Sequence, residues 1–188
     1  MMIFLIILVL LAVIVFYAIG VYNNYVNYDV ENKKAFSDLG TFLQKRLDLI
    51  PNLVETVKGY ASHESKTLES VVEARNRMLK IDLSDSKNIE EIQAMENQLT
   101  KTLRSLFALN ESYPDLKANT SFLELQETLK EIESEIVGAR RYYNATAGDL
   151  NKFIRKFPAV LFAGIFRFKE AELFKEDIDA KQAPKVSF

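Results

Sequence analysis

The chain of 188 residues carries 24 basic and 26 acidic side chains and contains no cysteine. This near balance of charge excludes a typical nucleic-acid-binding protein, which would concentrate Lys and Arg on one face. Without cysteine the chain can form no disulfide, thiolate metal site or acylated lipoprotein anchor. Its length suffices for one domain with a substantial core.

The N-terminal segment is the most apolar part of the chain. Residues 1–22 carry no charge, and 14 of the 17 positions from 3 to 19 are Ile, Leu, Val or Phe. A helix of about 20 such residues spans the hydrocarbon core of a bilayer. We therefore predict a single membrane-spanning helix over residues 1–22, whose lipid-embedded side chains include Ile3, Leu8, Val13 and Ile19.

A cleaved signal peptide is the alternative for this segment. Ala18 and Gly20 form a small-x-small pair, but no basic residue precedes the apolar run, which is also longer than the usual signal core. Retention is further favoured by tyrosines at positions 17, 22, 25 and 28, since tyrosine gathers at membrane interfaces.

The distribution of basic residues predicts the orientation of the anchor. The first basic residues, Lys33 and Lys34, follow the apolar segment, so the positive-inside rule favours an outside N-terminus and a cytoplasmic domain. Asp29 and Glu31 lie beside these lysines and weaken the bias.

Helical periodicity continues through the rest of the chain. Residues 23–35 are predicted to form a juxtamembrane stalk that continues as a helix, and apolar positions from 36 to 50 extend it to Pro51, where we expect one helix to end and the next to begin. Gly59, inside this second helix, is expected to allow close packing. The second helix ends near Ile81, and a third stripe follows through Ile89, Ile92, Met95, Leu99, Leu103 and Leu106.

The clearest stripe begins after Asn119, Thr120 and Ser121, which offer an N-cap, with Glu124 completing a capping box from Ser121. Apolar residues then recur at alternating steps of three and four up to Phe157, which predicts one helix of about 50 Å packed along its length. No strand-like alternation competes. We predict an all-α protein in which an antiparallel bundle of about four long helices, residues 36–168, follows the anchor, and residues 169–188 form a tail.

Residues 45–64, Lys-Arg-Leu-Asp-Leu-Ile-Pro-Asn-Leu-Val-Glu-Thr-Val-Lys-Gly-Tyr-Ala-Ser-His-Glu, closely resemble the signature of the LemA family of bacterial membrane proteins. The similarity continues in order to the C-terminus, through 113–119, Phe122, Leu125-Gln126, Leu129, 139–144, Asn151, Phe157-Pro158 and 184–188. The resemblance implies an N-terminal transmembrane helix and a domain of long antiparallel helices. It implies no reaction, and relatives associated with magnetosomes imply a membrane-organising role by analogy.

Motifs for catalysis are missing or incomplete. His63 is the only histidine, and Thr67 occupies the position where a zinc-protease helix would place its second histidine. Tyr60 likewise replaces the glutamate of a di-iron Glu-x-x-His motif. There is no cysteine nucleophile, glycine-framed serine or phosphate loop, so we predict no catalytic residue, no cofactor and no metal.

Arg46, Glu64 and Arg75 fall where the stripes predict apolar side chains, and Glu133 and Arg140 flank the long stripe of residues 122–157. The candidate polar network is Arg46, Glu55, Glu64, Arg75, Glu133 and Arg140. They are either solvated at the edge of the bundle, or a buried network that fixes helix register, or a ligand or catalytic site. Asn144 and Asn151 are seven residues apart and share one helix face, where hydrogen bonds to a neighbouring segment are expected.

The segment 157–168 carries one charge, Arg167, and is too short to span a bilayer. It is expected to fold back on the bundle, to contact a second subunit, or to rest in the membrane interface. The tail ends on an aromatic residue and is expected to dock. The candidate interaction residues are Phe162, Ile165, Phe166, Phe168 and Phe188.

Two functions remain. We predict a non-enzymatic, membrane-anchored scaffold whose partners are the lipid bilayer and either copies of itself or other membrane proteins, with no nucleic acid. The alternative is a ligand-binding sensor or an enzyme that uses the Arg/Glu residues inside the bundle.

Overall fold

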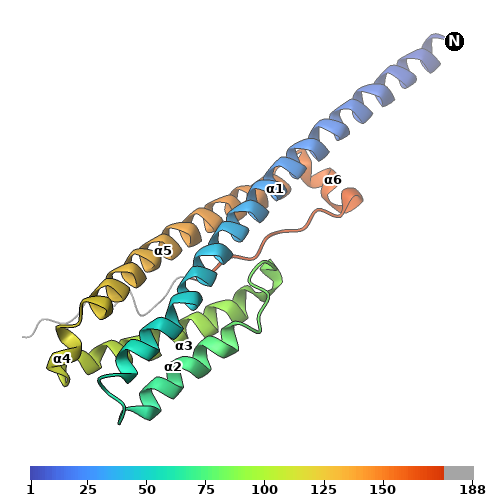
Figure 1. The fold of residues 1–188 in the computed structure, drawn as a ribbon. Helices are drawn as coiled ribbons and strands as arrows, with labels where there is room; N and C mark the ends of the chain where they lie inside the picture. Colours follow the sequence, from blue (N-terminus) through green and yellow to red (C-terminus); the bar gives the residue numbers. More distant parts are fainter. Residues whose placement is uncertain (176–188) are drawn as a thin grey trace, which may run out of the picture.

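The computed structural model describes residues 1–175, and within them it is helical with no strand. Figure 1 shows a long shaft that emerges from an elongated bundle. This confirms the predicted all-α fold with an apolar N-terminal helix and an antiparallel bundle. The helices are α1 (Met2–Lys58), α2 (Ser65–Met78), α3 (Ile89–Ala108), α4 (Pro114–Lys117), α5 (Thr120–Arg155) and α6 (Ala159–Phe166), with 3-10 turns at Ser86–Asn88 and Leu109–Glu111.

Helix α1 combines the shaft and the first helix of the bundle. Its 57 residues correspond to about 85 Å of continuous helix. The apolar beginning is long enough to cross a membrane, and none of that window is buried in the structure. Further along, its buried positions run from Val21 to Val57 and pack chiefly against α5.

The helix break predicted at Pro51 is wrong, because α1 continues through this proline to Lys58. A proline inside a helix removes the N–H that would bond to the carbonyl four residues earlier, here that of Leu47. In the structure Arg75 of α2 supplies the missing donor, since its Nε lies 2.9 Å from the Leu47 carbonyl oxygen. A tertiary contact therefore compensates for the backbone bond that Pro51 removes.

The loop between α2 and α3 comes very close to α1 at Gly40. A Cβ added to Gly40 would lie 2.7 Å from the Leu83 carbonyl oxygen, so the approach requires glycine. The expected close contact at Gly59 is wrong, because a Cβ there would meet only carbonyls of its own helix at 3.5 Å or more. Gly59 is instead the C-cap residue that follows the last residue of α1, Lys58.

Helix α5 lies antiparallel to α1 along most of the bundle. Its N-cap is Asn119, whose Oδ1 accepts a hydrogen bond from the Phe122 backbone N–H at 2.8 Å, so the capping box expected from Ser121 does not form. The predicted stripe is buried at Phe122, Leu129, Ile136, Tyr143 and Leu150. Near the end of the helix the buried face includes Ala147 and Ile154, and Phe157 is exposed.

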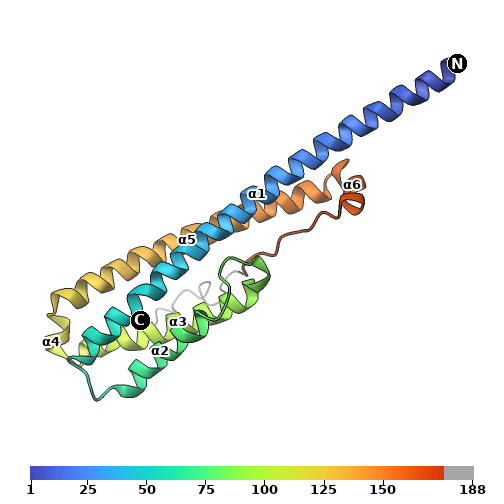
Figure 2. The same cartoon turned by 45° about the vertical axis from the view of Figure 1, so that its right-hand side comes forward.

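After α5 the chain returns along the bundle. Helix α6 lies beside α1, where the shaft meets the body, and residues 168–175 then run in extended form back toward α3 (Figure 2). We call residues 168–175 the strap. Phe174 on the strap belongs to the hydrophobic core and is only 3% exposed.

Candidate functional site: a polar seam closed by the strap

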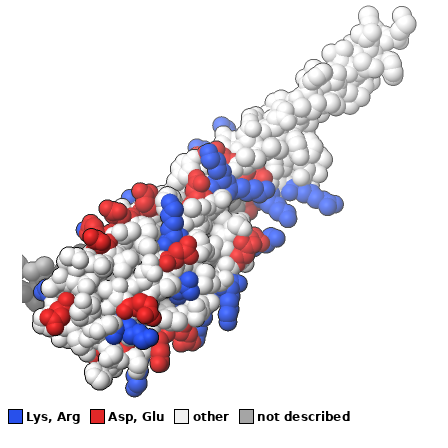
Figure 3. Space-filling model, viewed as in Figure 1, with Lys and Arg blue, Asp and Glu red and all other residues white. Residues whose placement is uncertain are grey.

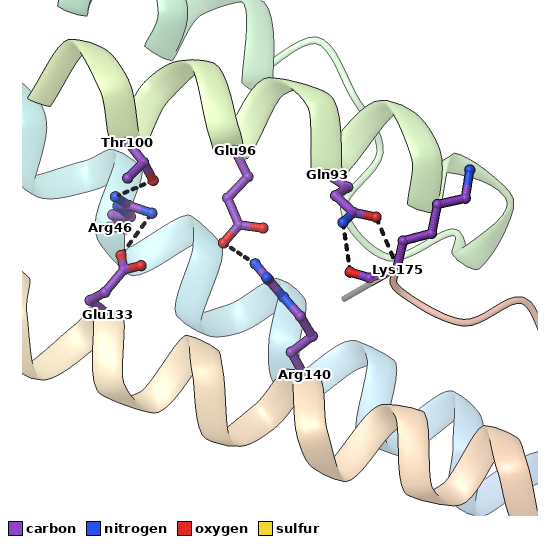
Figure 4. A network of polar contacts seen from close by, with 7 residues as sticks. All are labelled: Arg46, Gln93, Glu96, Thr100, Glu133, Arg140 and Lys175. Carbon is purple, nitrogen blue, oxygen red and sulfur yellow. Dashed lines mark hydrogen bonds and ion pairs between the residues drawn. The ribbon is translucent and has the colours of Figure 1, made fainter. Parts of the chain in front are cut away.

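The interior of the bundle contains charged residues where α1, α3 and α5 meet (Figure 4). The buried polar or charged residues among 1–175 are Asn32, Arg46 and Glu96. We call Arg46, Glu96, Thr100, Glu133 and Arg140 the polar seam.

Arg46 on α1 connects the other two helices. Its Nη1 lies 2.9 Å from Glu133 Oε2 on α5, and its Nη2 donates to Thr100 Oγ1 on α3 at 3.0 Å. The Arg46 side chain is only 6% exposed, whereas that of Glu133 is 42% exposed. The pair therefore joins a buried cation to a partly solvated anion at the edge of the bundle.

Arg140 on α5 pairs with Glu96 on α3. Burial raises the pKa of the Glu96 carboxyl above its ordinary value, and this effect outweighs the attraction of Arg140 and Arg46. The ionised carboxylate is therefore held in the interior at a cost, as expected for a desolvated pair. Arg140 also lies over the Phe174 ring at 5.4 Å, which links the seam to the strap.

Glu96 was not among the sequence candidates, although its spacing identifies it. The buried positions of α3 are Ile89, Ile92, Glu96, Leu99, Leu103 and Leu106, which follow steps of three and four without interruption. The sequence interpretation placed Met95 in this stripe instead, because methionine is apolar. Strict adherence to the spacing would have placed a carboxylate on the core face.

The remaining sequence candidates lie apart from the seam. Glu55 is exposed, and its one ion-pair partner among residues 1–175 is Lys58, at 3.7 Å. Glu64 accepts a hydrogen bond from the Tyr113 hydroxyl at 3.1 Å, and Arg75 binds the Leu47 carbonyl. The structure thus pairs Arg46 with Glu133 and places Arg140 nearby, in an ion pair with Glu96. Glu55, Glu64 and Arg75 make contacts outside the seam.

Three carboxamides bind the backbone of the strap. Asn151 and Asn144 each donate to the carbonyl and accept from the N–H of one strap residue, Ala171 and Phe174 respectively, at 2.8–3.0 Å. Gln93 on α3 binds Lys175 in the same way, at 2.8 and 3.2 Å. The expectation that Asn144 and Asn151 bond to a neighbouring segment is confirmed. Because these contacts read backbone groups, they recognise extended conformation rather than sequence.

Tyr143 and Phe174 supply the apolar part of strap binding. The Tyr143 hydroxyl donates to the Glu172 carbonyl at 2.7 Å, and burial raises the pKa of this tyrosine to about 12. Its ring meets Phe174 edge-on at a centroid separation of 5.7 Å, and Phe36 of α1 stacks on Phe174 at 6.4 Å. Phe174 is therefore the side chain that anchors the strap.

The candidate interaction residues are divided between two places. Phe162 and Phe166 of α6 face Tyr17 and Tyr22 of α1, with ring centroids 6.1 and 5.3 Å apart, and Phe168 stacks on Tyr25 at 4.0 Å. Ile165 points away from these rings and is 73% exposed. Phe188 lies outside the described residues.

The chemistry available at the seam is binding of charge. Within residues 1–175 no three His, Cys, Asp or Glu side chains gather where they could hold a metal ion. A pocket of about 290 Å³ opens beside Arg46 and is lined also by Thr100, Arg104, Lys130 and Glu133. Its cationic side chains suit a small anion better than a cation.

The amino-acid sequence is similar to those of several known proteins. The model of the LemA family matches residues 35–188. Protein LemA of Metamycoplasma hominis is 24% identical over 187 residues, which cover 95% of this chain and 84% of that protein. Magnetosome proteins MamQ 1 and MamQ 2 of Paramagnetospirillum magneticum are each 27% identical over 176 residues, 82% of this chain. The chain spans 65% of the length of these two magnetosome proteins.

Proposed function

The chain belongs to the LemA family, and from this premise we propose that it is a membrane-anchored helical scaffold that assembles with copies of itself or with other membrane proteins. The proposal includes a single-pass anchor in a bacterial inner membrane, an outside N-terminus and a cytoplasmic bundle. It assigns the chain no reaction.

The observation that carries the proposal is the continuity of α1. The same helix contains an apolar beginning with no buried side chain and a second half whose buried face forms the core with α5. Position and orientation of the bundle are therefore fixed relative to the shaft, without a flexible linker. A rigid connection between membrane and bundle is what a scaffold requires to hold partners at a set distance.

A groove at the far end of the bundle is the surface we propose for assembly. It lies between the end of α1 and α2, has a volume of about 700 Å³, and includes Val54, Leu68 and Val72 on its floor and walls. Lysine, arginine and glutamate side chains line its margins. An apolar strip with charged margins of both signs suits a helix from another copy of this chain.

Size-exclusion chromatography with light scattering on the detergent-solubilised full chain tests this proposal. We expect a mass that is a multiple of the monomer and that Val72→Arg reduces, because Val72 is 38% exposed in the groove. Val137→Arg is the matched control, since Val137 is 37% exposed on α5. A monomeric unmodified chain that also captures no membrane protein on crosslinking in native membranes would contradict the proposal.

The pocket beside Arg46 supports a second candidate, a sensor of a small anion. Arg46, Arg104 and Lys130 would supply the positive charge, and binding would compete with the ion pair to Glu133. Titration with phosphate and with carboxylates, followed by calorimetry, distinguishes the candidates. Saturable binding that Arg104→Gln weakens, together with a monomeric chain, would favour the sensor.

A further inference from the structure

Helix α6 lies at the level of the apolar shaft rather than on the core of the bundle. Phe162 contacts Tyr17 and Phe166 contacts Tyr22, so α6 runs beside the last turns of the uncharged N-terminal segment. Among its eight residues only Ala159 is buried. The hydrophobic core of the bundle contains no residue of α6.

The outer face of this region is strongly apolar. Phe157 and Ile165 are each 73% exposed, Leu161 is 61% exposed, and Val160 is 46% exposed. Removing large apolar side chains from water is favourable, so four of them together represent a substantial driving force for leaving water. Contiguous exposure of this kind indicates an interaction surface.

Positive charge surrounds this face. Residues 150–169 contain five Lys or Arg side chains (Lys152, Arg155, Lys156, Arg167 and Lys169) and no Asp or Glu, although the whole chain is slightly acidic. Arg155 pairs with Glu170, whereas the other four have no ion-pair partner among residues 1–175. Figure 3 shows Lys and Arg side chains gathered where the uncharged shaft joins the body. We call these five residues the basic collar.

We propose that α6 is a membrane-surface wedge, which inserts its exposed face among the lipids of an anionic leaflet while the basic collar binds their phosphates. The inference rests on the proposed anchoring of α1 in the bilayer, and it adds a second lipid-binding element formed by the other end of the chain.

The depth of α6 follows from the geometry of α1. Tyr17 precedes Tyr22 by five residues, which is about 7 Å along a helix. If the apolar run of α1 ends near Tyr22, Phe162 lies about 7 Å inside the boundary of the hydrocarbon. Interfacial helices bury their apolar faces to about 5–10 Å, so α6 is placed at the depth that such helices occupy.

Charge complementarity identifies the lipid. Lys and Arg side chains near an anionic surface are attracted to it, and four of the five collar residues have no ion-pair partner among residues 1–175. A neutral bilayer would satisfy the apolar face but leave the collar without partners. Another protein would have to match both the exposed apolar side chains and the position of this face at the bilayer.

Site-directed spin labelling of the full chain in vesicles tests the wedge, and the lack of native cysteine makes single labels unambiguous. The test label is attached at Leu161→Cys. The matched control is Leu173→Cys on the strap, since Leu173 is also an exposed leucine (46%), and Ile14→Cys reports the depth of the anchor. Accessibility to oxygen relative to a water-soluble nickel chelate reports depth. Vesicles would contain phosphatidylcholine alone or with phosphatidylglycerol.

We expect the label at 161 to be shallower than that at 14 and clearly deeper than that at 173. Its depth should increase with phosphatidylglycerol, and the double variant Lys156→Gln, Lys169→Gln should abolish that increase. A water-exposed label at 161 with a buried label at 14 overturns the wedge but keeps the anchor, whereas a water-exposed label at 14 overturns the anchor. Equal depth in both lipids overturns anionic recognition, and dipolar broadening between labels at 161 assigns the face to a second copy.

Discussion

At Glu96 the cost of burial opposes the attraction of nearby arginines. Burial raises its pKa from about 4.5, so the folded protein binds the proton more tightly than the unfolded chain. The stabilising contribution of the neutral form is therefore fully present below the ordinary pKa and is lost as pH rises through the raised value. Above that range the ionised carboxylate remains buried against Arg140 at a net cost.

We predict that Glu96→Gln changes the pH dependence of stability. As pH falls from about 8 to about 4, the melting temperature of the unmodified chain should rise relative to that of the variant. The reason is that the Glu96 carboxyl can take up a proton on folding, whereas the glutamine amide cannot. Thermal unfolding in detergent across this range measures the difference. Glu91→Gln, on an exposed position of the same helix, is the control. Parallel curves for the chain and Glu96→Gln would contradict the prediction.

Arg75 compensates for a specific loss in the backbone of α1. The Leu47 residue is fully buried, so its carbonyl would have no donor without the Arg75 guanidinium. We predict that Arg75→Met lowers the free energy of unfolding by about 1–3 kcal/mol, the cost of an unpaired buried acceptor. In a Pro51→Ala background the backbone N–H is restored, and the loss should shrink by about 1 kcal/mol.

A double-mutant cycle on urea unfolding measures this coupling between Pro51 and Arg75. Arg77→Met is the control on the same helix, because Arg77 is half-exposed and, among the residues that the structure describes, pairs only with Glu73. If Arg75→Met costs the same in both backgrounds, its contact with the Leu47 carbonyl does not compensate for the proline.

At the scale of elements, the strap is held by side chains that replace a neighbouring strand. Phe174 is 3% exposed, and within the described part of the chain its N–H and carbonyl bond only to Asn144. We predict that Asn144→Leu, which leaves both groups unpaired, releases the strap, with a cost of about 1–3 kcal/mol per group. Hydrogen exchange of residues 168–175 should accelerate strongly, whereas Asn97→Leu on an exposed face of α3 should leave it unchanged. Unaltered exchange in Asn144→Leu would show that Phe174 alone holds the strap.

Some features of the helices and the strap could be predicted from the sequence, and others could not. The apolar segment, the long stripe of α5 and the shared face of Asn144 and Asn151 were predictable because helical spacing is a local property. The continuation of α1 through Pro51 was not, because it depends on Arg75, 28 positions away along the chain. The place of Phe174 in the core was also missed, since a single aromatic residue in a polar extended segment has no periodicity.

The residues of the polar seam were likewise predictable in part, whereas their pairing was not. Arg46, Glu133 and Arg140 were identified because they interrupt or flank apolar stripes, but spacing alone did not pair them. Glu64 and Arg75 were named by the same reasoning and lie elsewhere, because position on a helix face does not fix which neighbour covers that face. Glu55, also a candidate, is exposed and pairs with Lys58. Glu96, the partner of Arg140, was not predicted, because the neighbouring Met95 is apolar and was assigned to the stripe of α3.

At the scale of the whole molecule, an early and a late segment of the described chain lie side by side. The shaft of α1 passes beside α6, and the strap begins there, so residues 17–25 and 159–168 together form the end of the bundle from which the shaft emerges (Figure 1). The α1–α2 groove lies near the opposite end of the bundle. Residues that contact lipid in our proposal are thus separated by the length of the bundle from those that contact a second copy.

This arrangement also determines which side of the membrane we expect the bundle to occupy. Lys33, the first basic residue after the shaft, is paired with Asp29 at 2.7 Å, which leaves little net charge there. The basic collar adds positive charge at the same end of the fold, four of its five residues having no ion-pair partner among residues 1–175, and favours the anionic cytoplasmic surface. We predict that Ser134→Cys, at an exposed position of α5, resists a membrane-impermeant maleimide in intact cells and reacts in inside-out vesicles. Because the chain has no other cysteine, labelling in intact cells would directly place the bundle outside.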